Sequence, residues 1–264
     1  MQDYNYINKN NLLLEIKGLK KKFGGLTAIS DFSLYLKKSE LRGLIGPNGA
    51  GKTTVFNLIT GFHKPNKGKI LFKGIDITAE SPDRRVNRGI GRTFQKIRME
   101  RYTKVVDEVK MAFFRHMSYN FFDLIFQTTK CRQEEKQIEE KSLEILDFLG
   151  ITHLANQIAE DLPFPLQRKV SIARALALKP ELLLLDEPAS GLNPNETKEL
   201  IELIYKIKEK FNLTIIIIEH DMTFVMTICD DIIAMNEGNI IGRGTPKGIQ
   251  NNKRVIEAYL GGIS

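Results

Sequence analysis

One short run constrains the fold of this chain more than any other part of its sequence. Residues 46–53 read Gly-Pro-Asn-Gly-Ala-Gly-Lys-Thr and match the pattern G-x-x-x-x-G-K-[ST] in full. The run lies between an apolar strand-like segment, Leu41 to Ile45, and a helix-like segment, Lys52 to Thr60, which Gly61 can end. A glycine-rich loop in this setting turns backbone N–H groups toward an anion at the positive end of a helix dipole. The run therefore predicts a phosphate-binding loop in an α/β domain.

The residues of this loop have distinct expected roles. The Lys52 ammonium is expected to meet the β and γ phosphates of a nucleotide, and the Thr53 hydroxyl to ligate magnesium. We expect nucleotide contacts from the whole loop and the first helical turn, namely from Gly46, Pro47, Asn48, Gly49, Ala50, Gly51, Lys52, Thr53 and Thr54. A glycine-rich turn that contains lysine by chance would have the same composition, but the strand and helix on either side argue against it.

A second candidate site is an acidic pair at the end of an apolar segment. Leu182 to Leu185 is a continuous apolar run, and Asp186 and Glu187 follow it directly. The carboxyl ends of parallel strands border the phosphate crevice of an α/β sheet, so both carboxylates are expected near the loop. Asp186 would hold magnesium through water, and Glu187 could accept a proton from an attacking water. An acidic pair that closes a strand is otherwise often a solvated turn.

The other apolar segments predict the fold class. The run Leu213 to Ile218, like Leu182 to Leu185, is typical of a parallel strand covered on both faces. Helical patterns extend over Gln167 to Leu178 and over Glu196 to Lys210, the second with Asn193 as its N-cap. Shorter strand-like segments occur near the N-terminus, at Leu12 to Ile16, Phe32 to Leu36 and Lys69 to Phe72. From about Thr93 to Leu162, Phe and Met clusters and charged helical spacing predict an all-helical insertion.

Two further residues become candidates through their order in the chain. A lone Gln95 would ordinarily be a surface residue, and a lone His220 at a strand end would ordinarily be structural. The chain contains four elements in the order found in the ATP-binding subunits of ABC transporters. They are the phosphate loop, Gln95, the acidic pair and His220. The chain resembles that family from about Leu12 to Gly262.

The resemblance implies a fold and a set of site residues. The fold is a P-loop NTPase (RecA-like) core with an antiparallel β subdomain, residues 1–93 and 166–264, and an inserted α-helical subdomain, residues 94–165. ATP and Mg²⁺ are the implied cofactors, and Phe23 falls where the family stacks an aromatic ring on adenine. The implied catalytic residues are Glu187, His220, Gln95 and Lys52. The implied magnesium ligands are Thr53, Gln95 and Asp186.

Within the family, the chain is most similar to the Liv-type ATPases of branched-chain amino-acid importers. The likeness extends over residues 23–29, 57–62, 92–98, 219–222 and the C-terminal run 254–261, Arg-Val-Ile-Glu-Ala-Tyr-Leu-Gly. All ABC ATPases share the nucleotide-binding motifs, whereas this C-terminal sequence is specific to one branch of the family. It therefore indicates an importer of branched-chain amino acids.

One loop departs from the family pattern. The signature loop, which faces the partner's ATP in this family, consists here of Leu162, Pro163, Phe164, Pro165, Leu166 and Gln167. Pro165 occupies a glycine position whose N–H the family directs at the partner's γ-phosphate, and proline has no N–H. Since proline can begin a helix at Leu166, the substitution leaves the fold unaffected but puts the strength of the ATP-bound dimer in question.

The resemblance also implies partners and a place in the cell. The partners are two integral-membrane permeases, a second ABC ATPase in a hetero- or homodimer and, indirectly, an extracytoplasmic binding protein, which places the chain at the cytoplasmic face of the cell membrane. Permeases would dock at the groove between the core and the helical insertion, beside Gln95. The candidate residues there are Met111, Phe113, Phe114 and Phe121 to Phe126. Core packing of the insertion explains most of these apolar residues equally well.

Composition and hydropathy bear on the class of protein to which this chain belongs. The chain has 264 residues, of which 42% are hydrophobic, two cysteines without ligand spacing, and a net charge of +7. The polar N-terminus, and the absence of a run near the roughly 18 apolar residues of a spanning helix, predict a protein that is neither secreted nor transmembrane.

Two other classes of function remain as alternatives. The positive charge would suit an ABC-type ATPase that acts on nucleic acid or ribosomes, but the single cassette and the dispersed lysines argue against it. A small-molecule kinase with a phosphate loop would leave His220 and the signature region unexplained. We therefore expect no nucleic-acid partner.

Overall fold

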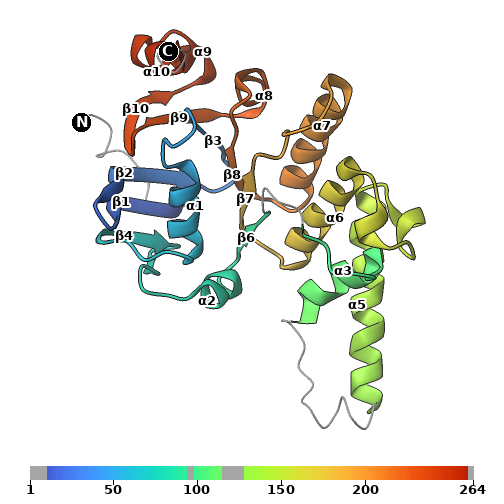
Figure 1. Cartoon of the computed structure of the whole chain (residues 1–264). Coiled ribbons are helices and arrows are strands. Elements are labelled where there is room, and N and C mark those ends of the chain that lie inside the picture. The colour runs from blue at the N-terminus through green and yellow to red at the C-terminus, as the bar shows by residue number, and fades with distance from the viewer. Residues whose placement is uncertain (1–10, 94–97, 115–127, 261–264) are drawn as a thin grey trace. The chain divides into compact units, whose positions relative to one another are not determined.

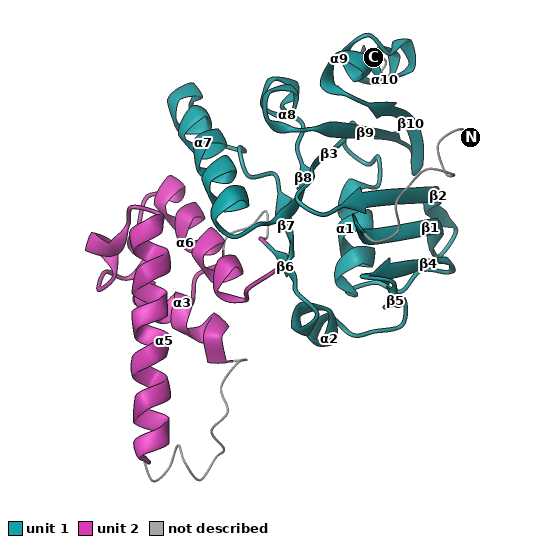
Figure 2. Ribbon diagram, turned by 180° about the vertical axis from the view of Figure 1, so that it is seen from behind, with its two compact units in different colours: residues 1–92, 181–264 teal, residues 93–180 magenta. Residues whose placement is uncertain are grey.

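The computed structural model describes residues 11–93, 98–114 and 128–260, and its contacts divide the chain into two compact units (Figure 2). Unit 1 consists of Met1–Arg92 and Glu181–Ser264, and unit 2 consists of Thr93–Pro180. The sequence predicted boundaries at 93/94 and 165/166. The second observed boundary lies later because the helix that starts at Phe164 packs with the other helices of unit 2.

Unit 1 is built on one mixed sheet in the order β5-β4-β1-β2-β10-β9-β3-β8-β7-β6. The antiparallel part contains β1 (Leu12–Phe23), β2 (Leu26–Lys37), β4 (Lys67–Phe72) and β5 (Ile75–Asp76). The parallel part contains β3 (Leu41–Ile45), β6 (Ile90–Arg92), β7 (Leu182–Asp186), β8 (Thr214–Ile218) and β9 (Asp231–Asn236), with β10 (Asn239–Gly244) antiparallel to β9. This arrangement confirms the predicted α/β core with an antiparallel subdomain.

The three central strands β3, β7 and β8 are buried along their whole length, as their continuous apolar sequences predicted. The helices of unit 1 are α1 (Lys52–Thr60), α2 (Pro82–Asn87), α7 (Pro194–Lys210), α8 (Met222–Ile228), α9 (Pro246–Gln250) and α10 (Lys253–Leu260). Figure 1 shows α1 beside the antiparallel strands, and Val55 and Phe56 of α1 belong to the same buried core as residues of β1, β2 and β4.

The predicted helix ends of α1 and α7 are confirmed. Helix α1 ends at Thr60, and Gly61 follows with a φ of +83°, the left-handed conformation of a C-terminal glycine. Helix α7 begins with a capping box, in which the Asn193 side chain accepts the Glu196 N–H and the Glu196 side chain accepts the Asn193 N–H.

Unit 2 is helical in the described residues. Its main elements are α3 (Val105–Phe113), α5 (Thr129–Phe148) and α6 (Phe164–Ala177), and α3 packs against both others. Of the predicted docking residues, Phe113 is buried, Met111 and Phe114 are exposed, and Phe121 to Phe126 lie outside the described residues. In the part of the chain that the structure describes, no helix combines the length and apolar character needed to cross a bilayer.

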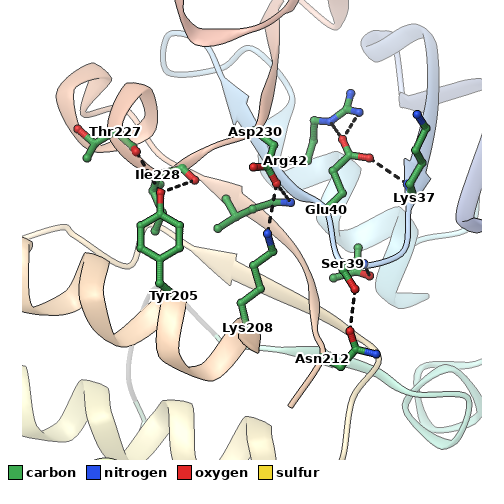
Figure 3. Close-up of polar contacts among 12 residues, drawn as sticks. Lys37, Ser39, Glu40, Arg42, Tyr205, Lys208, Asn212, Thr227, Ile228 and Asp230 are labelled. Atoms are coloured by element: carbon green, nitrogen blue, oxygen red, sulfur yellow. Dashed lines mark hydrogen bonds and ion pairs between the residues drawn. The ribbon is translucent and has the colours of Figure 1, made fainter. Parts of the chain in front are cut away.

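A polar network joins the amino-terminal ends of the parallel strands (Figure 3). Arg42 of β3 donates through Nε to Glu40 at 2.7 Å, and its Nη1 lies 2.8 Å from the Asp231 carboxylate. Arg42 is buried, so the two carboxylates compensate for its lost hydration. Burial raises the pKa of Asp231, and the nearby Arg42 charge opposes that shift.

We expect Arg42→Ala to lower the free energy of unfolding by about 3 kcal/mol, because it leaves two poorly hydrated carboxylates without their cation. Loss of Arg42 should raise the pKa of Asp231 further. The destabilisation should therefore be largest at neutral pH and shrink as falling pH protonates that carboxylate. Urea unfolding at pH 7 and pH 5 measures both effects. Lys206→Ala, at an exposed position of α7, is the control and should change stability by less than about 0.5 kcal/mol.

Candidate functional site

The loop between β3 and α1 has the backbone that the sequence predicted. Gly46, Gly49 and Gly51 have φ angles of +150°, +81° and +100°, which side chains disfavour. Close packing also excludes a side chain at two of them. A Cβ at Gly46 would lie 2.2 Å from the Met235 carbonyl oxygen, and one at Gly51 would lie 2.7 Å from the Ala28 carbonyl oxygen. Neighbouring strands thus fix the loop in a shape that glycine alone accommodates.

Lys52 lies folded over this loop. Its Nζ donates to the carbonyl oxygens of Gly46 at 2.6 Å and Pro47 at 3.0 Å. Burial lowers the pKa of Lys52, while the charges of Glu187, Asp186 and Glu219 oppose that shift. The ammonium therefore lies among carboxylates and carbonyl groups, in a position where phosphate oxygens could replace the carbonyls. Thr53 is exposed at the next position.

Asp186 ends β7 and is almost completely buried. Its Oδ2 lies 2.7 Å from Nη2 of Arg92, at the end of the neighbouring strand β6, and Nη1 of Arg92 donates to Asn57 Oδ1 at 2.7 Å. The pairing of β6 with β7 brings Arg92 to this position. Sequence reasoning gave Arg92 no role. The available signal was a charged residue three positions before Gln95.

The structure brings together Glu187 and His220, two of the residues implied to be catalytic. They follow the adjacent parallel strands β7 and β8, and the His220 Nδ1 lies 3.9 Å from a Glu187 carboxylate oxygen. Glu187 is mostly buried and His220 is exposed. The backbone at Glu187 is left-handed, with a φ of +49°, and its N–H donates to the Ile218 carbonyl at 2.9 Å. A non-glycine residue keeps this conformation only where its surroundings hold it, as they do at six other described positions of the chain.

Phe23, the predicted adenine platform, lies at the end of β1 and is 41% exposed. Its ring contacts His63 edge-on, with centroids 5.0 Å apart, and the Lys21 ammonium lies 4.8 Å from its centroid. The Lys21 ammonium also donates to the Lys64 carbonyl, so the segment after α1 supports the ring while one side stays open.

The signature loop differs from its prediction at one point. Helix α6 begins at Phe164 with Pro163 as its N-cap, three residues before the start at Gln167 that the helical pattern predicted. Pro165 therefore occupies the first helical turn, where a missing N–H costs little. The N–H groups of Leu166 and Gln167 donate to the Pro163 carbonyl at 2.9 Å and 3.1 Å.

The structure describes three more residues of the predicted set and leaves a fourth outside the described part of the chain. The Gln167 side chain donates to the carbonyls of Glu160 and Leu162, so it points back into its own loop. Leu162 is buried and Phe164 is exposed. Gln95 lies outside the described residues.

The side chains at the site fit a magnesium ion that takes only some of its ligands from the protein and the others from water and the nucleotide phosphates. Asp186 and Thr53 supply a carboxylate and a hydroxyl, and Mg²⁺ favours one or two such ligands together with waters and substrate phosphates. Among the described residues there is no group of three or more His, Cys, Asp and Glu side chains that could hold a metal ion by itself.

Comparison with known families gives two matches. The profile of the ABC transporter family matches residues 29–190. The profile described as branched-chain amino acid ATP-binding cassette transporter matches residues 239–263, which contain β10, α9 and α10.

Individual relatives match over almost the whole chain. A high-affinity branched-chain amino acid transport ATP-binding protein, BraF of Pseudomonas aeruginosa, is 41% identical over 94% of this chain and 98% of its own length. LivG of Escherichia coli, with the same description, is 42% identical over the same shares. A solved ATP-binding cassette of an ABC transporter in its ADP conformation is 31% identical, with a TM-score of 0.81 over 95% of this chain and 99% of that one.

Proposed function

Since this chain belongs to the ABC transporter family as one of its ATP-binding proteins, we propose that it hydrolyses ATP to drive an importer of branched-chain amino acids. The ATPase class follows from the family, and the match of residues 239–263 to the branched-chain amino acid profile supports the cargo. That segment lies outside the nucleotide-binding motifs, so it distinguishes this branch from other ABC ATPases.

Each site residue has its own role in ATP hydrolysis. The loop amides and Lys52 bind the phosphates, with the ammonium exchanging the carbonyls of Gly46 and Pro47 for phosphate oxygens. Glu187 accepts a proton from the attacking water, and His220, 3.9 Å away, contacts the same reacting region. Gln95 completes the set as a magnesium ligand and a catalytic residue. Phe23 stacks on the adenine through its exposed side.

Thr53, Asp186 and Gln95 are the proposed magnesium ligands, and the ion supplies positive charge to the phosphates when bound. Arg92 already neutralises the Asp186 carboxylate at 2.7 Å. The carboxylate is thereby held in one orientation at the end of β7.

The proposed assembly contains two such ATPases, identical or different, and two integral-membrane permeases that hold them at the cytoplasmic face of the cell membrane. An extracytoplasmic binding protein delivers the amino acid to the permeases. Each phosphate loop faces the other subunit's signature loop across two bound ATP molecules. The exposed side chains of Met111 and Phe114 in unit 2 are candidates for permease contact.

We expect the isolated chain to have low ATPase activity that rises when its permeases are added. Phosphate release in detergent or nanodiscs, with and without permeases, measures the stimulation. Leucine with its binding protein should stimulate further, whereas an unrelated hydrophilic amino acid should not.

Binding to DNA or RNA would favour the nucleic-acid alternative, particularly if its affinity fell steeply with salt while permeases left the ATPase rate unchanged. Stimulation by permeases without a response to leucine would retain the transporter ATPase and reject the proposed cargo.

A further inference from the structure

Glu219 is a fully buried carboxylate that the proposed chemistry does not use. It lies directly after β8 and before His220, and its exposed fraction is 0%. A carboxylate in such a position must recover its lost hydration through hydrogen bonds or charges. Its partners therefore indicate what it holds in place.

Both carboxylate oxygens accept backbone N–H groups, from two different loops. Oε1 accepts the Ala189 N–H at 2.6 Å, and Oε2 accepts the His220 N–H at 3.1 Å. Ala189 lies two residues after Glu187 in the loop that follows β7, and His220 lies in the loop that follows β8. One side chain thus ties together the two loops that carry the proposed base and the proposed histidine. Burial raises the pKa of Glu219, and these amide donors oppose that shift.

The loop after β7 needs such support. Glu187 has a left-handed backbone, with a φ of +49°, which persists only where surrounding contacts determine it. The Glu187 N–H is held on one side by the Ile218 carbonyl at 2.9 Å. The contact between Ala189 and Glu219 holds the other side of the same turn. The turn is therefore fixed at both ends by residues of β8 and its following loop.

We propose that Glu219 is a positioning residue that sets the placement of Glu187 relative to His220. The inference rests on the proposed ATPase function and adds to it a residue that does not touch ATP. Loss of its hydrogen bonds should let the left-handed turn relax and displace the Glu187 carboxylate. A displacement of about 1 Å at a reacting group can cost about 10² in rate. ATP binding should change less than kcat, because the phosphate loop and Phe23 lie on other elements, although Glu219 does affect Lys52 through its charge.

The test compares Glu219→Gln and Glu219→Ala with wild type. The glutamine carbonyl can still accept the Ala189 N–H, but its NH₂ group cannot accept the His220 N–H. We expect kcat to fall about tenfold in Glu219→Gln and up to about 10² in Glu219→Ala, with KM for ATP within about threefold. Without nucleotide, hydrogen exchange at the Ala189 amide should be much faster in Glu219→Ala and only slightly faster in Glu219→Gln, whose neutral carbonyl is a weaker acceptor. Glu181→Gln, at the other end of β7, is the matched control and should leave kcat and Ala189 exchange unchanged.

Several results would overturn the role of Glu219. The first is an unchanged kcat in Glu219→Gln. The second is an equal loss of kcat in the Gln and Ala variants, which would indicate that the charge itself acts in the reaction. The third is unchanged exchange at the Ala189 amide in Glu219→Ala. A lower Tm with a wild-type kcat in these variants would likewise show that Glu219 stabilises the fold and does not position Glu187. If Glu219→Ala fails to fold, Glu219→Gln still decides the question. A wild-type chain without ATPase activity would instead reject the proposed function, and Ala189 exchange would still report on the hydrogen bond.

Discussion

Glu187→Gln is expected to lower ATP turnover by about 10² to 10⁴, the loss typical of a missing general base. Glutamine has nearly the same shape, so it should keep the turn after β7, but it cannot take a proton from water. ATP binding should persist, because the phosphate loop and Lys52 are unchanged. The variant should therefore form a dimer that ATP stabilises and does not release. Phosphate release measures the turnover, and gel filtration with and without ATP measures the dimer.

Glu202→Gln, on the exposed face of α7, provides the control for loss of one negative charge. It should retain wild-type turnover and form no trapped dimer. Wild-type turnover in Glu187→Gln would remove Glu187 from the role of base. The 3.9 Å contact with His220 would then have to be explained as structural.

Pro165→Gly should tighten the ATP-dependent dimer by about ten- to a hundredfold at each site in the Glu187→Gln background. The glycine restores an N–H that can donate to the partner's γ-phosphate, and a hydrogen bond to a charged acceptor contributes roughly 1.5 to 3 kcal/mol. The Leu166 and Gln167 amides already donate to the Pro163 carbonyl, so they compensate poorly for the missing donor. Affinity of the monomer for ATP should not change. Analytical ultracentrifugation over a range of ATP concentrations measures the dimerisation.

Pro246→Gly makes the same change in the first turn of α9 and should leave dimerisation unaltered. If Pro165→Gly dimerises no better than its parent, the lost N–H is not what limits the dimer. Repeating the measurement with a sister ATPase would then show whether an intact signature loop on that subunit supplies the competent site.

The parts of the fold that local patterns specify could be predicted from the sequence. Continuous apolar runs identified β3, β7 and β8, and glycine and asparagine caps identified the ends of α1 and α7. Strand β6 has three residues, which is too short to produce a recognisable pattern, so it was not predicted. The start of α6 was placed too late because its cap, Pro163, accepts hydrogen bonds through its main chain and has no capping side chain.

The same distinction applies to the site. The phosphate loop is contiguous in sequence, so its position between a strand and a helix was predictable, while the roles of its residues stay predictions. The closeness of Glu187 and His220 was not predicted, because it depends on β7 and β8 being neighbours in the sheet. The contact of Arg92 with Asp186 and that of Glu219 with Ala189 depend on register between strands that are distant in sequence. No local pattern encodes that register. The assignments of Gln95, Phe23 and the signature loop stay predictions.

The strand order of the sheet also determines when the nucleotide site can form during synthesis. Strand β3, which leads into the phosphate loop, pairs with β8 and β9, and both are encoded near the C-terminal end of the chain. At about 5 to 20 residues per second, the ribosome needs on the order of ten seconds or more to reach them after completing β3. Until then neither edge of the apolar strand β3 has its partner strand. Unit 2 is one continuous segment, so all of its residues have been synthesised before β8 is. The phosphate loop is thus synthesised well before β8 and β9, the strands that complete its surroundings.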